Sequence, residues 1–243
     1  MWILTVSIHH ENHKTMKNAQ DKIKAQRGVR IITWQMRWWY ALWQFLLQVV
    51  LIFFFRLRTF HVEYTDVEGG ALIVANHQSY IDPPAIGARI KGKINYLAQK
   101  GLFKFKPFAK LIASFDAIPL DKDGIGFEGI KETFKRLKNG ERVLIFPEGE
   151  RTRLPNGEMM PFKKGVMTLA IRSKVPIIPA AIAGAFEAWP RHQKLPNIFP
   201  DQKNIVRVIF GEPIPYETAA AMSEDELNNY VESRVHELYE QIR

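Results

Sequence analysis

The sequence has no cysteine among its 243 residues. This absence excludes disulfide bonds, catalytic thiols and thiolate metal sites, and it suits a reducing compartment. No Gly-x-Ser-x-Gly motif is present, so the sequence gives no indication of the nucleophile turn of a serine hydrolase. The seven histidines show no spacing that is typical of metal ligands, and we expect neither a metal nor a bound cofactor.

The sequence also lacks a hydrophobic run of comfortable length for crossing a bilayer. The uncharged run 38–55 has 18 residues, about 27 Å as a helix, whereas a spanning helix needs about 20 residues. We do not expect a signal peptide here, because the preceding tract is too long and no small-residue cleavage site follows. A core helix is the alternative, but the start of the run carries a cluster typical of a membrane interface. Its members are Trp34, Trp38, Trp39 and Trp43.

Positive charge is concentrated near the N-terminus. Residues 1–60 carry nine Lys and Arg against two acidic residues, whereas residues 61–243 carry 25 against 23. Basic charge beside an aromatic apolar run indicates an anionic membrane surface. Nucleic acid is the competing partner, but no recognisable nucleic-acid module accompanies the charge. We therefore predict a membrane-associating helical segment at 1–60 and a separate domain at 61–243, with Met1 and Met16 both candidate starts.

Both flanks of the run 38–55 are basic, which argues against a single span. With the domain on the cytoplasmic side, a span would place seven cations outside. Gln44 and Gln48, four residues apart on one helical face, would also lie near the bilayer centre. A helical hairpin in the interface avoids both problems, because the glutamines can then face water or the domain. We expect a monotopic protein on the cytoplasmic face of the inner membrane.

From residue 71 onward, short apolar runs alternate with helical patterns. This order predicts an α/β fold with a mostly parallel or mixed sheet flanked by helices. Gly140 is expected just after a helix end, and Ser223 to Glu226 has capping-box spacing. The expected strands are 71–75, 94–98, 116–120, 142–146, 176–182 and 204–210. The expected helices are 83–91, 102–113, 125–139, 164–174 and 223–241, and 184–203 is expected to be a long loop.

The stretch Ala71-Leu72-Ile73-Val74-Ala75-Asn76-His77 delivers an imidazole to the end of a buried strand. Asp82 follows five residues later, and Pro83 comes next. We expect Asp82 to cap the following helix, with Pro83 at its first position. The turn could instead fold the carboxylate onto one ring nitrogen, which would leave the other nitrogen of His77 as a general base. Both interpretations are open at this point.

A second strand ends in Phe146-Pro147-Glu148-Gly149-Glu150, followed by Arg151 and Arg153. Two arginines beside a glycine-containing turn can bind a phosphate through paired hydrogen bonds. Lys122, after the strand at 116–120, would bring another cation to the same edge of the sheet. The alternative is a solvated charged loop.

Four blocks of the sequence, taken in order, resemble the glycerolipid acyltransferase family. They are His-x-x-x-x-Asp, Ala-Ile-Pro-Leu-Asp-Lys, Phe-Pro-Glu-Gly and Val-Pro-Ile-Ile-Pro, within about residues 70–185. The resemblance is strongest to the 1-acylglycerol-3-phosphate acyltransferases. Two positions depart from the family pattern: Glu150 stands where a small or hydroxylated residue is usual, and Lys122 stands where Arg is common.

The resemblance implies acyl transfer from an acyl-carrier-protein or coenzyme A thioester to the sn-2 hydroxyl of lysophosphatidic acid, giving phosphatidic acid. His77 would be the base and Asp82 would orient it. The implied acceptor-binding residues are Lys122, Glu148, Gly149, Arg151 and Arg153. Ser79 is expected to be structural, because this chemistry needs no acyl-enzyme. The alternatives are another lysolipid acceptor such as lyso-ornithine lipid, or a membrane anion-binding module without turnover.

Overall fold

The computed structural model describes residues 42, 44–99, 118–120, 126–198 and 205–243. Within these residues, seven strands form one sheet in the order β1-β7-β6-β2-β5-β3-β4. The strands are β1 (Arg58–Phe60), β2 (Ala71–Ala75), β3 (Ile94–Gln99), β4 (Ile118–Leu120), β5 (Arg142–Ile145), β6 (Ile177–Ala183) and β7 (Arg207–Phe210). The predicted mixed α/β sheet is confirmed.

Strand β2 lies at the centre of the sheet, hydrogen-bonded to β5 on one side and β6 on the other, both parallel to it. β3 and β4 continue in the same direction, and only the β6–β7 pairing is antiparallel. All five residues of β2 are buried. A strand covered on both faces has no side facing water, which explains why its sequence is continuously apolar instead of alternating.

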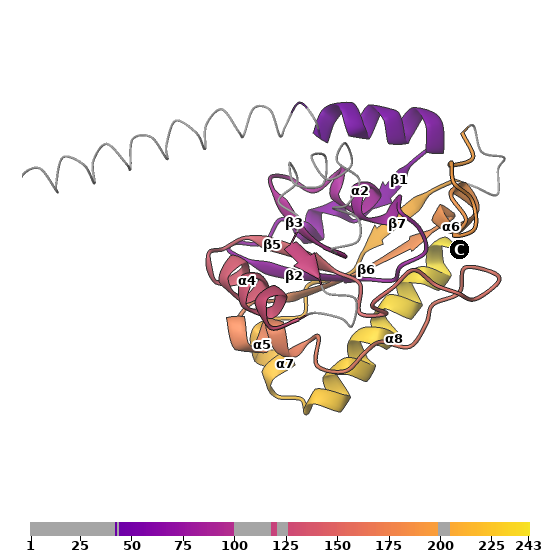
Figure 1. The fold of residues 1–243 in the computed structure, drawn as a ribbon. Helices are drawn as coiled ribbons and strands as arrows, with labels where there is room; N and C mark the ends of the chain where they lie inside the picture. The colour runs from indigo at the N-terminus through magenta and orange to yellow at the C-terminus, as the bar shows by residue number, and fades with distance from the viewer. Residues whose placement is uncertain (1–41, 43, 100–117, 121–125, 199–204) are drawn as a thin grey trace, which may run out of the picture. The chain divides into compact units, whose positions relative to one another are not determined.

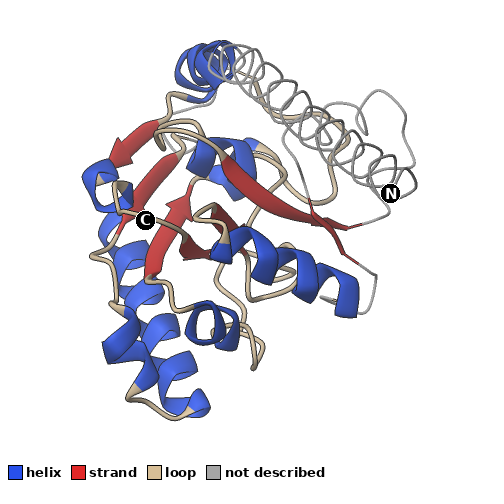
Figure 2. Ribbon diagram, turned by 90° about the vertical axis from the view of Figure 1, so that its left-hand side faces the viewer, coloured by secondary structure: helices blue, strands red, loops and turns tan. Residues whose placement is uncertain are grey.

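Helices cover both faces of the sheet (Figures 1 and 2). They are α2 (Asp82–Gly87), α4 (Phe127–Lys138), α5 (Thr168–Ser173), α6 (Ala185–Ala188), α7 (Tyr216–Ala220) and α8 (Glu224–Ile242), with a 3-10 turn η1 (Val62–Thr65) and an unlabelled helix at 44–55. Leu72 and Val74 of β2 face a core shared with α4, α5, α7 and α8. Ile73 faces the other core, shared with α2, α6 and the helix 44–55.

The expected elements lie close to where the sequence placed them. Gly140 has the positive φ (78°) of a residue after a helix end, and Ser223 and Glu226 form the predicted capping box at the start of α8. The helix expected from 164 begins only at Thr168, because Gly165 has a φ of 85° that no α-helix accommodates. The helix expected at 102–113 lies outside the described residues.

Besides the 3-10 turn η1, three short elements were not predicted. β1 has only three residues and lies at the edge of the sheet, so it carries no apolar run that would mark it. α6 lies inside 184–203, which was expected to be a long loop; that expectation is wrong for Ala185–Ala188. α7 is a five-residue helix after Pro215 with a single buried residue, Ala219. Such elements form because of their tertiary contacts and have little local signal.

The helix 44–55 packs on the α2 side of the sheet through Leu51 and Phe55. Gln44 donates from Nε2 to the carbonyl oxygens of Gly87 (2.9 Å) and Ile90 (2.7 Å). Gln44 therefore faces the domain, one of the two environments expected for it. These bonds pair two carbonyl oxygens close to the C-terminal end of α2. The helix ends at Gly87, earlier than the predicted residue 91.

The opposite side of this helix is apolar and exposed, with Phe45 at 60%. Among the described residues, no helix is both long and apolar enough to cross a membrane. The chain divides into two compact units, Met1–Trp43 and Gln44–Arg243. Most of the basic segment predicted to contact a membrane lies outside the described residues, and the division into 1–60 and 61–243 stays a prediction.

Candidate active site

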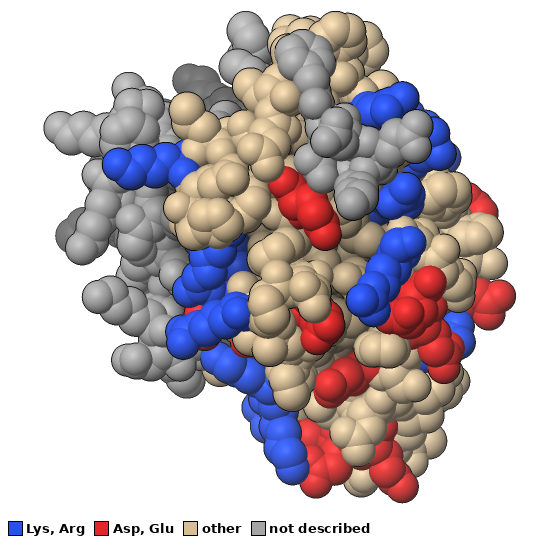
Figure 3. Space-filling view, turned by 90° about the vertical axis from the view of Figure 1, so that its right-hand side faces the viewer, with Lys and Arg blue, Asp and Glu red and all other residues tan. Residues whose placement is uncertain are grey.

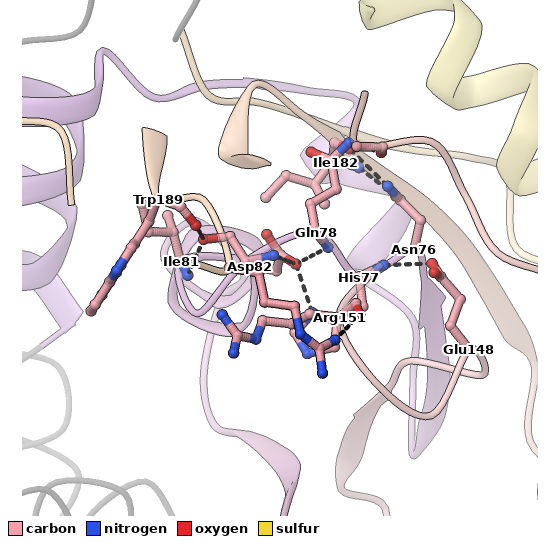
Figure 4. A network of polar contacts seen from close by, with 12 residues as sticks. Asn76, His77, Gln78, Ile81, Asp82, Glu148, Arg151, Ile182 and Trp189 are labelled. Carbon is pink, nitrogen blue, oxygen red and sulfur yellow. Dashed lines mark hydrogen bonds and ion pairs between the residues drawn. The ribbon is translucent and has the colours of Figure 1, made fainter. Parts of the chain in front are cut away.

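His77 leaves the sheet at the carboxyl end of β2, and the residue before it fixes that exit. Asn76 is fully buried, and its side-chain amide pairs with the backbone of Ile182 in β6. Its Nδ2 donates to the Ile182 carbonyl (2.9 Å), and its Oδ1 accepts from the Ile182 N–H (2.8 Å). The pair continues the β2–β6 ladder by one step through a side chain (Figure 4). The backbone of His77 is therefore free to turn away from the sheet at a defined point.

The loop after β5 holds the backbone of His77 from the other side. The His77 N–H donates to Oε1 of Glu148 (2.7 Å), and the Thr152 N–H donates to the His77 carbonyl (2.7 Å). Both polar backbone groups of His77 are thus paired with residues more than 70 positions away. The carboxyl ends of neighbouring parallel strands meet at one edge of a sheet, which is why these two loops come together.

The imidazole of His77 is held on two sides. Its Nδ1 lies 2.7 Å from Oδ2 of Asp82, and its ring stacks on Phe146 with centroids 4.1 Å apart and an interplanar angle of 17°. Because the carboxylate accepts from Nδ1–H, this contact favours the tautomer with a lone pair on Nε2. The side chain remains 17% exposed. The contact between the two residues that the sequence suggested is confirmed, and the arrangement suits a general base.

Asp82 does not cap α2, so that part of the prediction is wrong. Ile81 is the N-cap and Asp82 is the first residue of the helix. Its carboxylate points back into the turn, where Oδ2 also accepts from the backbone N–H groups of Gln78 (2.5 Å) and Ser79 (2.7 Å). The side chain is fully buried. Three donors to Oδ2 therefore offset part of the cost of burying this carboxylate, whose Oδ1 has no hydrogen-bond partner among the described residues, and they fix its position against the imidazole.

Ser79 has a structural environment. Its hydroxyl is buried and donates to the carbonyl oxygen of Trp189 (3.1 Å). A serine whose hydroxyl is committed to a backbone carbonyl is poorly placed to act as a nucleophile. This supports the expectation that Ser79 is structural.

Glu148 lies behind His77 and is 3% exposed. Oε1 accepts from His77, and Oε2 accepts from the Met160 N–H (3.1 Å). Burial raises the pKa of this carboxyl to about 8, although the two backbone hydrogen bonds act in the opposite direction. The following residue, Gly149, has a φ of 78°, and a Cβ there would lie 2.5 Å from Nζ of Lys163. The predicted binding roles of both residues remain predictions.

Arg151 is the basic residue placed beside the His77 turn. Its guanidinium carbon lies 3.6 Å from the centroid of the Tyr80 ring, a cation–π contact. The side chain is partly buried, which lowers the pKa of Arg151 from its ordinary value, while Tyr80 and Asp82 act against that shift. Arginine remains a cation at neutral pH in such an environment. Figure 4 shows Arg151 next to Asp82 and His77.

Arg153 points elsewhere. Its guanidinium pairs with Glu150 at 2.8 Å, and the side chain is 68% exposed. Arg191 pairs with the same carboxylate at 3.1 Å. Partial burial raises the pKa of Glu150, but these two guanidinium groups outweigh that effect and hold the pKa below its ordinary value. Of the two arginines expected to bind a phosphate together, only Arg151 thus lies at the His77 turn. Lys122 lies outside the described residues.

Several residues of the site were not found by reasoning from the sequence, among them Phe146, Trp189 and Arg191. Phe146 belongs to a motif that was recognised, but nothing local indicated that its ring stacks on His77. Trp189 and Arg191 lie in a segment expected to be a plain loop, and they meet the site through contacts across 110 and about 40 positions of the chain. Among the described residues, no group of three or more His, Asp or Glu could hold a metal ion.

Comparison with known proteins identifies relatives of the chain. The family described as "Acyltransferase" matches residues 57–183. The 1-acyl-sn-glycerol-3-phosphate acyltransferase of Bacillus subtilis is 32% identical over 169 residues, covering 69% of this chain and 78% of that protein. An enzyme of the same name from Cocos nucifera is 30% identical over 173 residues, covering 70% of this chain and 52% of that protein.

A solved structure also resembles the chain. It is the crystal structure of the 1-acyl-sn-glycerophosphate (LPA) acyltransferase PlsC from Thermotoga maritima, with a TM-score of 0.61 and 27% identity. The match covers 74% of this chain and 68% of that one. The similarity therefore includes most of the α/β domain.

The raised pKa of Glu148 predicts a specific pH dependence of stability. The folded state binds the Glu148 proton more tightly than the unfolded state, where the ordinary value is 4.5. The resulting stabilisation is complete below pH about 4.5 and is lost as the pH rises through about 8. We expect the free energy of unfolding of Glu148→Gln to fall less between pH 5 and 8 than that of the wild type, by on the order of a few kcal/mol. Urea unfolding at a series of pH values measures both slopes.

Glu158→Gln, on the exposed part of the same loop, is the control and should keep the wild-type slope. If Glu148→Gln also kept that slope, the buried carboxyl would not be the group that titrates.

Proposed function

The chain belongs to the acyltransferase family, and from this membership and the geometry at His77 we propose that it acylates the sn-2 hydroxyl of lysophosphatidic acid to give phosphatidic acid. The acyl group comes from an acyl-carrier-protein or coenzyme A thioester. The observation that carries the proposal is the 2.7 Å contact between Nδ1 of His77 and the buried carboxylate of Asp82. Relatives that bear the name of this activity support the choice of acceptor.

In the proposed reaction, Nε2 of His77 takes the proton of the acceptor hydroxyl as its oxygen attacks the thioester carbonyl. The tetrahedral intermediate collapses with loss of the thiolate, which receives the proton back from His77. Asp82 stabilises the imidazolium that exists between the two steps. Stacking on Phe146 keeps the ring in one plane throughout. One base serves both transfers, so no acyl-enzyme is needed.

The acceptor phosphate is assigned to Arg151, with Lys122 as a second cation. Arg151 already lies beside the His77 turn with its guanidinium on the Tyr80 ring. Arg153 could join only by leaving Glu150, so its share of the binding is smaller. Glu148 and Gly149 contribute by shaping the backbone that faces the glycerol, since the Glu148 oxygens accept from backbone N–H groups.

We also propose that the helix 44–55 attaches the domain to the cytoplasmic surface of an anionic membrane. One side of the helix packs on the domain through Leu51 and Gln44. The other side exposes Phe45, Val49 and their neighbours. An apolar face of this kind suits insertion into the headgroup region beside the lysolipid acceptor.

The test of the reaction is an assay with purified protein, a labelled acyl donor and a panel of acceptors. Acyl-carrier-protein and coenzyme A thioesters are each offered with lysophosphatidate, glycerol 3-phosphate and lyso-ornithine lipid. We expect lysophosphatidate to be acylated fastest. Preferred acylation of lyso-ornithine lipid would overturn the acceptor, and no transfer from either donor would indicate a binding module.

His77→Ala and Asp82→Asn should each lower kcat for acyl transfer by about 10²- to 10⁴-fold, the usual contribution of a positioned general base. Rate measurements at saturating substrate give the effect, and circular dichroism checks the fold. His236→Ala, an exposed histidine on α8, should retain full activity. Near-wild-type turnover by His77→Ala would rule out the mechanism.

Arg151→Ala should raise KM for lysophosphatidate by about 10- to 100-fold, because it removes a charge-assisted contact worth about 1.5–3 kcal/mol. KM for the acyl donor should change little. Arg153→Ala is the matched control, and we expect a much smaller rise because that side chain is exposed and paired with Glu150. An equal rise in KM for both substrates of Arg151→Ala would assign the residue a structural role.

Phe45→Asp combined with Val49→Asp should weaken binding to phosphatidylglycerol vesicles, since charges replace two exposed apolar side chains. Vesicle flotation measures the bound fraction. Leu195→Asp changes a side chain that is 77% exposed in a loop, and it should leave flotation unchanged. Equal loss in both variants would contradict a specific role of the helix.

A further inference from the structure

The segment Trp189–Arg191, which follows α6, contacts both motifs of the site. The Trp189 carbonyl accepts from Ser79, and the Trp189 ring lies edge-on to Tyr80 with centroids 5.5 Å apart. Two residues later, Arg191 donates from Nη1 to the carbonyl oxygen of Arg151 (2.6 Å) and from Nη2 to Glu150 (3.1 Å). The segment therefore joins the turn after β2 to the loop after β5.

These contacts meet at the stacked pair of Arg151 and Tyr80. The Arg151 guanidinium lies 3.6 Å from the centre of the Tyr80 ring. Trp189 supports the ring, and Arg191 holds the backbone of Arg151. Both members of the stack are thus positioned by residues of one short segment.

The position of a cation matters here because both signs of charge lie on this side of the molecule, so charge alone would not direct a phosphate to one place. Figure 3 shows the right-hand side of the view in Figure 1, and both Lys and Arg atoms and Asp and Glu atoms lie on that face. A free arginine side chain also loses rotamer entropy when it is fixed. An arginine that is already held against a ring and by its own backbone avoids most of that loss when a phosphate binds.

Glu150 holds Arg191 in this arrangement through an ion pair. Here the carboxylate binds Arg191 and Arg153 together, and its pKa is held low, so it is ionised at neutral pH. Glu150 and Arg191 therefore form a link that a small residue at position 150 would remove.

We propose that Arg191 is a positioning residue for the acceptor: anchored by Glu150, it holds the backbone of Arg151 so that the guanidinium stays on Tyr80, ready to bind the acceptor phosphate. The inference rests on the proposed function and extends it to a residue outside the four family motifs. Arg191 acts through Arg151 and does not itself touch the acceptor.

Arg191→Ala should raise KM for lysophosphatidate by about 3- to 10-fold, in line with the loss of one or two hydrogen bonds. kcat and the KM for the acyl donor should stay within about twofold. Arg191→Lys should give an intermediate KM, because an ammonium can serve the Arg151 carbonyl or Glu150 but not both in the same geometry. Lys194→Ala removes an equal charge from the same loop, where the described residues show no hydrogen bond or ion pair for Lys194. It should match the wild type.

The Arg151→Ala background tests whether Arg191 acts through Arg151. Adding Arg191→Ala to that variant should cause no further rise in KM, since there is no guanidinium left to position. Additive effects would mean that Arg191 binds the acceptor directly and would overturn the proposal. A KM of Arg191→Ala for lysophosphatidate that is no higher than that of Lys194→Ala would also overturn the proposal. If the alanine variant fails to fold, the KM of Arg191→Lys for lysophosphatidate is compared with the wild-type value instead.

The outcome is separable from that of the proposed function. If the wild type does not acylate lysophosphatidate, the proposed function fails. If the wild type does so and Arg191→Ala is unchanged, only the role of Arg191 fails.

Discussion

The site depends on one buried carboxylate. Asp82 accepts hydrogen bonds from the His77 imidazole and from the backbone N–H groups of Gln78 and Ser79, all within six residues. A carboxylate without partners would be too costly to bury, so the turn must bring all three donors to it. The same turn therefore orients the imidazole through a local contact, and the ring of Phe146 stacks on its face.

The rest of the sheet fixes where that turn lies. β2 is the central strand, and its neighbours β5 and β6 run parallel to it, so their carboxyl ends meet at the same edge. From β6, the backbone of Ile182 pairs with Asn76, and from the β5 loop, Glu148 and Thr152 hold the backbone of His77. The hydrogen bonds within the turn and the contacts from β6 and the β5 loop thus act together, and both restrict the position of the imidazole.

Electrostatics then distinguishes the arginines near the His77 turn. The three arginines near the site are not equivalent, because Glu150 pairs with Arg153 and Arg191 while Arg151 lies on Tyr80. A count of basic residues in the sequence would treat them alike. Their different environments are the basis on which we propose phosphate binding for Arg151 and a positioning role for Arg191.

The sequence by itself determined the parts whose information is local. The apolar run of β2 predicted the strand, and the His77–Asp82 spacing suggested the ring contact as one of two interpretations, because the residues concerned are neighbours in the chain. The alternation of apolar and helical patterns predicted the α/β class. Only the tertiary structure decided that Asp82 turns away from the helix it begins, that Phe146 stacks on His77, and that Trp189 and Arg191 reach the site. Those contacts join residues about 40 to 110 positions apart or depend on which of several local hydrogen bonds the packed turn allows, and no local pattern encodes either.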